Sequence, residues 1–165
     1  MDWRTYLFSF DGRINRAKYW LFVLVGLLFV AVMVAIAMPY ILIARRTAGA
    51  PMGGFTPLLI VTIVVEFVVL LAYLVAGFAI AIKRLHDRNK SGWWSIVFLV
   101  LPSVFNLIGR AAGGPGGGGA LFELVGLGLS VWAFVELGCL RGTDGTNDYG
   151  PDPLGGGGNE AEVFT

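Results

Sequence analysis

The sequence predicts an all-α polytopic membrane protein with four transmembrane helices and a short N-terminal interfacial helix. Four apolar stretches support this prediction, at residues 19–44, 58–82, 93–109 and 120–140. A hydrocarbon core of about 30 Å needs about 20 helical residues, so the first two stretches span it comfortably and the third only just. The apolar runs are continuous rather than alternating, which is typical of helices and not of barrel strands. Apolar residues make up 56% of the 165 and charged residues only 14%, which leaves no room for a separate soluble domain.

Ahead of the first stretch, Trp3, Tyr6, Leu7 and Phe10 recur at the spacing of one helical face. This pattern predicts a short helix lying in the cytoplasmic interface. Residues 11–12 read as a turn, and Asn15 is placed to cap the first spanning helix.

Proline and glycine predict where the helices end. Pro39 is expected to kink the first spanning helix or to end its regular part, and residues 47–56 form an outer loop. The second helix should continue through residues 83–88 until the turn signal at 89–92. Glycine-rich segments at 109–119 and 154–165 predict a flexible outer loop and a disordered tail. We therefore expect one membrane domain over residues 1–153.

Basic residues predict the orientation. Nine of them flank the predicted inner ends of the spans, against three on the other side: Arg4, Arg13, Arg16, Lys18, Lys83, Arg84, Arg88, Lys90 and Arg141 against Arg45, Arg46 and Arg110. Both termini are therefore expected in the cytoplasm. The net charge of +1 argues against a nucleic-acid partner.

This topology brings residues 9–13, 83–88 and 142–153 to one cytoplasmic surface. On a helical continuation Arg84, Asp87 and Arg88 share a face, and Lys83 can pair with Asp87 four residues on. One interpretation is that these charges fix orientation and tie the loops into a cap. The sharper one is a pocket for a phosphate or lipid headgroup, bound by guanidinium groups. The candidate binding residues are Arg13, Arg16, Arg84, His86, Asp87, Arg88, Trp93, Trp94, Asn147 and Tyr149.

Glu66 is an ionisable residue near the middle of the second span, about 13 Å from its outer end at about 1.5 Å per residue. An intramembrane carboxylate is a candidate proton or cation site, and a protonated Glu66 hydrogen-bonded between helices is the structural alternative. Glu136, near the inner end of the fourth span, is expected to pair with a cytoplasmic arginine.

No enzyme or metal signature emerges from the residue pattern. His86 is the only histidine and no zinc spacing exists, so neither a metal nor a cofactor is expected. His86 would need a partner other than Asp87 to act as a base, because adjacent helical residues point apart. No catalytic residue is assigned, and Cys139, the only cysteine, excludes an internal disulfide.

The same three segments resemble a family of small bacterial inner-membrane proteins catalogued as domain of unknown function 805. The matching residues are 10–16 with Tyr19 and Trp20, 84–87 with 91–94, and Gly142, Gly145, Asn147 and 149–153. The resemblance implies a bacterial plasma-membrane protein and assigns no activity.

We expect a non-enzymatic inner-membrane component whose basic and aromatic inner face binds anionic lipid headgroups, a protein partner or a second copy. One alternative is a small transporter or channel component that uses Glu66. The other is a membrane enzyme that acts on lipid-linked substrates through His86, Asp87 and the arginines.

Overall fold

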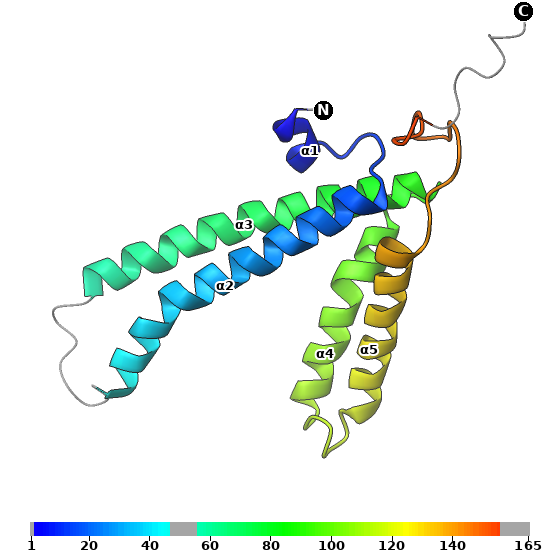
Figure 1. Cartoon of the computed structure of the whole chain (residues 1–165). Coiled ribbons are helices and arrows are strands. Elements are labelled where there is room, and N and C mark those ends of the chain that lie inside the picture. Colours follow the sequence, from blue (N-terminus) through cyan, green and yellow to red (C-terminus); the bar gives the residue numbers. More distant parts are fainter. Residues whose placement is uncertain (1, 47–55, 156–165) are drawn as a thin grey trace, which may run out of the picture. The chain divides into compact units, whose positions relative to one another are not determined.

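A computed structural model describes residues 2–46 and 56–155 and confirms an all-helical fold (Figure 1). Within these residues no strand forms, and Asn147 and Gly150 make one isolated bridge. The outer loop predicted at 47–56 lies outside the described residues except for its last residue, and the tail predicted at 154–165 except for its first two. The chain divides into two compact units, one of Met1–Trp20 with Gly77–Thr165 and one of Leu21–Ala76.

Two helices begin the chain where the sequence predicts them. Helix α1 spans Trp3–Phe8 and α2 spans Arg16–Arg46. Asn15 caps α2 as predicted, because its Oδ1 accepts the Lys18 N–H at 3.0 Å. The helix does not end at Pro39. A proline removes one backbone hydrogen bond, and the turns on either side keep the helix together.

In the unit of Leu21–Ala76, α2 packs against α3, which spans Thr56–Asp87. The Tyr73 ring stacks on Phe22 and Phe29, with centroids 5.1 and 5.3 Å away. Gly26 makes this contact possible, because a Cβ there would lie 1.9 Å from the Tyr73 hydroxyl. A small residue thus sets how closely the two helices approach.

The C-terminal end of α3 is a capped terminus at the predicted turn. Asn89 adopts the left-handed conformation, with φ of 55°, and the Lys90 N–H donates to the Leu85 carbonyl at 2.9 Å. This arrangement satisfies carbonyls that the last helical turn would otherwise leave free.

A helical hairpin follows in the unit that contains the termini. A π-helical turn η1 (Ile96–Val100) leads into α4 (Leu101–Ala111), and α5 (Ala120–Phe134) continues into a second π-helical turn η2 (Val135–Cys139). A Cβ at Gly126 would meet the Pro102 carbonyl at 3.1 Å, so glycine permits close packing of α4 and α5. A buried apolar cluster of this unit consists of Ala81, Leu85, Phe98, Ala133 and Leu137.

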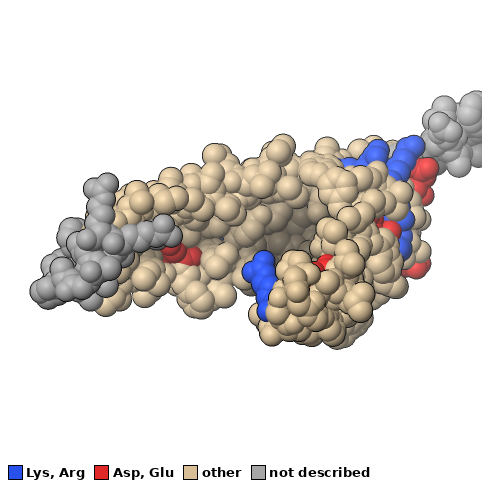
Figure 2. Space-filling model, turned by 90° about the horizontal axis from the view of Figure 1, so that it is seen from below, with Lys and Arg blue, Asp and Glu red and all other residues tan. Residues whose placement is uncertain are grey.

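Among the described residues, three helical segments are long and apolar enough to cross a membrane: Arg16–Tyr40, Leu59–Asp87 and Ala120–Cys139. The segment Ile96–Ala111 is apolar but shorter. Large apolar side chains point outward, including Leu28 at 67% and Leu121 at 74% exposure. In Figure 2 the visible helix surfaces are almost wholly tan, whereas most blue and red atoms gather at one end. The chain is therefore a helical membrane protein, since lipid removes the cost of this exposure.

Candidate functional site

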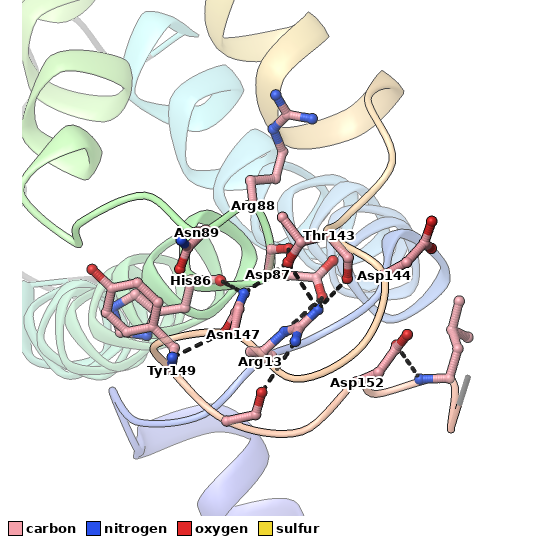
Figure 3. Close-up of polar contacts among 12 residues, drawn as sticks. Arg13, His86, Asp87, Arg88, Asn89, Thr143, Asp144, Asn147, Tyr149 and Asp152 are labelled. Atoms are coloured by element: carbon pink, nitrogen blue, oxygen red, sulfur yellow. Dashed lines mark hydrogen bonds and ion pairs between the residues drawn. The ribbon is translucent and has the colours of Figure 1, made fainter. Parts of the chain in front are cut away.

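The structure brings together the three segments that the sequence places on one surface. Residues 9–16, the polar end of α3 and the loop 142–153 meet around the Asp87 carboxylate, within one compact unit. Figure 3 shows Arg13, Thr143 and Asn147 converging on this end of α3. Most of their contacts join residues far apart in the sequence.

Asp87 lies between two buried arginines. Its Oδ1 accepts the Arg13 Nε–H at 3.2 Å, with Arg13 Nη2 at 3.1 Å, and its Oδ2 accepts from Arg84 Nη1. The side chains are at most 4% exposed, so the cluster carries one excess positive charge almost without solvent. Such a charge is tolerated only where further polar groups compensate for the lost water.

Backbone carbonyls supply that compensation. Arg13 donates through Nη1 to the carbonyls of Gly145 and Gly150, at 2.6 and 3.1 Å, and through Nη2 to that of Thr143 at 2.6 Å. The planar guanidinium of Arg13 thereby fixes the irregular loop, with a donor geometry that a lysine lacks.

Arg84 uses its remaining donors on the end of η2. Its Nε donates to the Leu137 carbonyl at 2.9 Å and its Nη2 to the Leu140 carbonyl. Carbonyls at a helix C-terminus lack intrahelical partners and attract cations. Arg84 therefore fixes the end of α5 and η2 to α3.

Gly142 is required by the close approach of the loop to Asp87. A Cβ at this position would lie 2.0 Å from Asp87 Oδ2. The Thr143 N–H then donates to the Asp87 carbonyl at 2.8 Å. Residue-by-residue reasoning missed both roles, although the family pattern that the sequence resembles includes Gly142.

Lys83 corrects one sequence prediction, because it does not pair with Asp87. Its buried ammonium donates to the carbonyls of Thr5, at 2.9 Å, and Tyr6, in the last turn of α1. The two arginines already occupy the carboxylate, and the end of α1 offers carbonyl acceptors, of which that of Thr5 also accepts the Ser9 N–H. The pKa of Tyr6 is raised, since its partial burial disfavours the phenolate.

His86, Asn147 and Tyr149 form a second contact between α3 and the loop. The His86 and Tyr149 rings stack with centroids 3.9 Å apart, and His86 Nδ1 lies 3.2 Å from the Gly12 carbonyl. Asn147 Nδ2 donates to the His86 carbonyl at 2.8 Å. In the same loop, the N–H groups of Leu154 and Gly145 donate to the Asp152 carboxylate, and they hold the pKa of Asp152 below its ordinary value.

Arg88 belongs to a different group and points away from Arg13 (Figure 3). Arg88 and Lys90 both pair with Glu136 Oε1 at 2.7 Å, which confirms the predicted pairing of Glu136 with an arginine. The Lys90 ammonium also lies 5.5 Å from the Trp94 ring centroid. Trp93 is 77% exposed.

The remaining candidates lie apart from the Asp87 cluster. Arg16 is exposed and donates to the Cys139 carbonyl at 2.9 Å. Glu66 lies in the other unit, on α3. Within residues 2–46 and 56–155 no three His, Cys, Asp or Glu side chains are grouped so that they could hold a metal ion. The Asp87 cluster thus acts as a tie between segments, because its donors and acceptors bind one another.

We predict that Asp87→Asn destabilises the protein by about 3 kcal/mol or more, because it leaves two arginines buried without a counter-charge. Thermal unfolding in mild detergent measures the effect. Asp144→Asn is the matched control, since the Asp144–Arg141 pair is 73% and 68% exposed and contributes about 0–1 kcal/mol. Equal stability of the two variants would contradict the role of Asp87.

Comparison with known proteins yields a family and no activity. Inner membrane protein YhaH of Escherichia coli K12 is 28% identical over 158 residues, covering 93% of this chain and 97% of its own length. The uncharacterised protein YiiR of the same organism is 33% identical, with 92% and 90% covered, and inner membrane protein YhaI is 29% identical, with 88% and 86%. No solved structure gives a significant match. The family described as "Protein of unknown function (DUF805)" matches residues 7–151, so the chain belongs to the DUF805 family.

Proposed function

We propose that the chain is a non-enzymatic component of the bacterial inner membrane that crosses it four times and binds anionic phospholipid headgroups on its cytoplasmic face. Two relatives named as inner membrane proteins support the location. The distribution of the basic side chains supports the binding.

Packing within the hairpin supports a fourth crossing. Phe98 contacts Trp132 near one end of the hairpin and Phe105 contacts Phe122 near the other, at 5.0 and 6.4 Å between centroids. If α5 crosses the bilayer, a helix packed along it must cross as well. Ile96–Ala111 is about 24 Å long at about 1.5 Å per residue, and local thinning of the bilayer accommodates a short span at modest cost.

The fourth crossing predicts where cysteines are labelled in a Cys139→Ser background. A membrane-impermeant maleimide added to spheroplasts should react with Gly116→Cys in the α4–α5 connection and not with Asp148→Cys. Permeabilisation should expose Asp148→Cys. Labelling of Asp148→Cys in intact spheroplasts would contradict the orientation.

The lipid-binding proposal rests on one observation: some of the basic side chains are buried, whereas others are accessible. Arg13, Lys83 and Arg84 are buried and bind protein oxygens. Contact with a headgroup would require these side chains to leave those partners. We therefore assign them to holding the N-terminal segment, α3 and the loop 142–153 together. Accordingly, we do not assign headgroup binding to the buried arginines.

The accessible cations, which we call the basic rim, are Arg16, Arg88, Lys90 and Arg141. Three of these side chains pair with two carboxylates, Glu136 and Asp144, and Arg16 donates to a backbone carbonyl, so two positive charges are in excess within this group. Near an anionic leaflet each basic residue contributes about 1 kcal/mol. The exposed Trp93 adds an aromatic side chain suited to the interface.

We predict that the double variant Arg16→Gln, Arg141→Gln retains phosphatidylglycerol roughly 30-fold less well at low salt, which corresponds to about 2 kcal/mol. Native mass spectrometry of protein from mixed phosphatidylglycerol and phosphatidylcholine nanodiscs measures the retention. Arg110→Gln, an exposed cation in the last turn of α4, is the control and should behave as wild type. Equal retention by all three proteins would refute the basic rim as a binding surface.

A second candidate function is transport through Glu66. Thr62 approaches Tyr40 on α2 at 3.4 Å, and Tyr73 stacks on Phe29. Glu66 lies between these contacts on the same face of α3, opposite a wholly apolar stretch of α2 at residues 30–39. Its buried Oε1 has no hydrogen-bond partner among the described residues. Such a carboxylate favours a proton or cation site.

For this second function we expect Glu66→Gln to abolish proton or cation flux in reconstituted vesicles, because the amide has similar size and cannot release a proton. Asp148→Asn, a carboxylate in the polar loop, serves as the control and should retain flux. Wild-type flux in the Glu66→Gln protein would exclude the transport function.

A further inference from the structure

A groove lies beside the inner end of α3, on the side of the turn that leads into η1. Its volume is about 390 Å³, which falls within the usual range for small-ligand sites. It is separate from the basic rim. Its lining combines apolar and hydroxyl side chains, and includes Phe78, Ile82, Ser91, Gly92, Trp93 and Ser95.

His86 presents an unused nitrogen next to this groove. The Gly12 carbonyl can only accept a hydrogen bond, so His86 Nδ1 must carry the proton in that contact. Partial burial lowers the pKa of His86 and favours the neutral ring, which leaves a lone pair on Nε2. Among the residues that the structure describes, Nε2 has no hydrogen-bond partner.

Gly92 keeps the path to this nitrogen open. A Cβ at position 92 would lie 3.6 Å from His86 Nε2 and 3.0 Å from Ile82 Cγ2. Any larger residue would therefore fill the space between the groove and the imidazole. This feature distinguishes the groove from a simple gap between helices, because it gives the site a fixed hydrogen-bond acceptor.

The groove's chemistry defines its occupant. Phe78 and Ile82 provide an apolar wall on a spanning helix, suited to the start of an acyl chain. His86 Nε2 requires a donor, and the exposed face of Trp93 attracts a cation. Ser91 accepts the Trp93 N–H at 3.5 Å, and its hydroxyl is free to donate to a phosphate oxygen.

From these observations, the geometry points to a site for one phospholipid of the inner leaflet whose headgroup donates a hydrogen bond, as the ammonium of phosphatidylethanolamine does. The inference rests on the proposed membrane placement and not on the basic rim. Phosphatidylcholine offers a matched comparison, because its quaternary ammonium carries no N–H while its chains and phosphate are the same.

The first test uses the single histidine as a probe in the wild-type protein. ¹⁵N-histidine-labelled protein, freed of any histidine tag, is placed in nanodiscs of phosphatidylcholine with or without phosphatidylethanolamine. The Nε2 resonance should move when phosphatidylethanolamine is present, and the Nδ1 resonance should stay. Identical Nε2 resonances in both nanodiscs would overturn the site.

The second test compares lipid retention by native mass spectrometry. Wild type should retain phosphatidylethanolamine about tenfold better than phosphatidylcholine, as one hydrogen bond with a charged donor allows. Gly92→Ala and His86→Phe should each abolish that preference. Arg16→Gln, Arg141→Gln should leave it unchanged, which separates this site from the basic rim. No preference of the wild type for phosphatidylethanolamine over phosphatidylcholine would refute the proposal even if both variants misfold.

Discussion

The Asp87 carboxylate is the constraint on which the polar end of α3 and the segments around it depend. It accepts hydrogen bonds from Arg13 and Arg84 with almost no access to water, and each arginine then reaches carbonyls of a different segment. Buried charges are stable only when all their partners are present. The N-terminal segment, α3, the end of η2 and the loop after it therefore hold one another in place.

This constraint separates the basic residues by role. The most buried cations, Arg13, Lys83 and Arg84, satisfy carbonyls where helices and the loop end. The more accessible Arg88 and Lys90 share one carboxylate, Glu136, and retain a positive excess. The orientation predicted from the sequence rests on a count of basic residues, and that count includes both groups. Only their burial separates the residues that bind protein carbonyls from those that remain accessible.

Sequence reasoning predicted the helices well, since a long apolar run has few other solutions in lipid. It also predicted Asn15 as a cap and the turn at Asn89, because both signals are local. Spacing along α3 placed Arg84 on the face of Asp87 correctly, but it also favoured Lys83 as a partner, whereas the second partner is Arg13, 74 residues away. No local rule reveals such a distant contact, nor the close approach that requires Gly142.

The most direct measurement of the central claim is hydrogen exchange of residues 142–150 in nanodiscs, followed by mass spectrometry. The Thr143 N–H donates to the Asp87 carbonyl on α3, whereas the Asn147 N–H donates to Gly150 within the loop, so the Thr143 amide reports on the tie between the segments. The account predicts slow exchange at Thr143, comparable with the end of α3. Exchange at the rate of an unstructured peptide would contradict it.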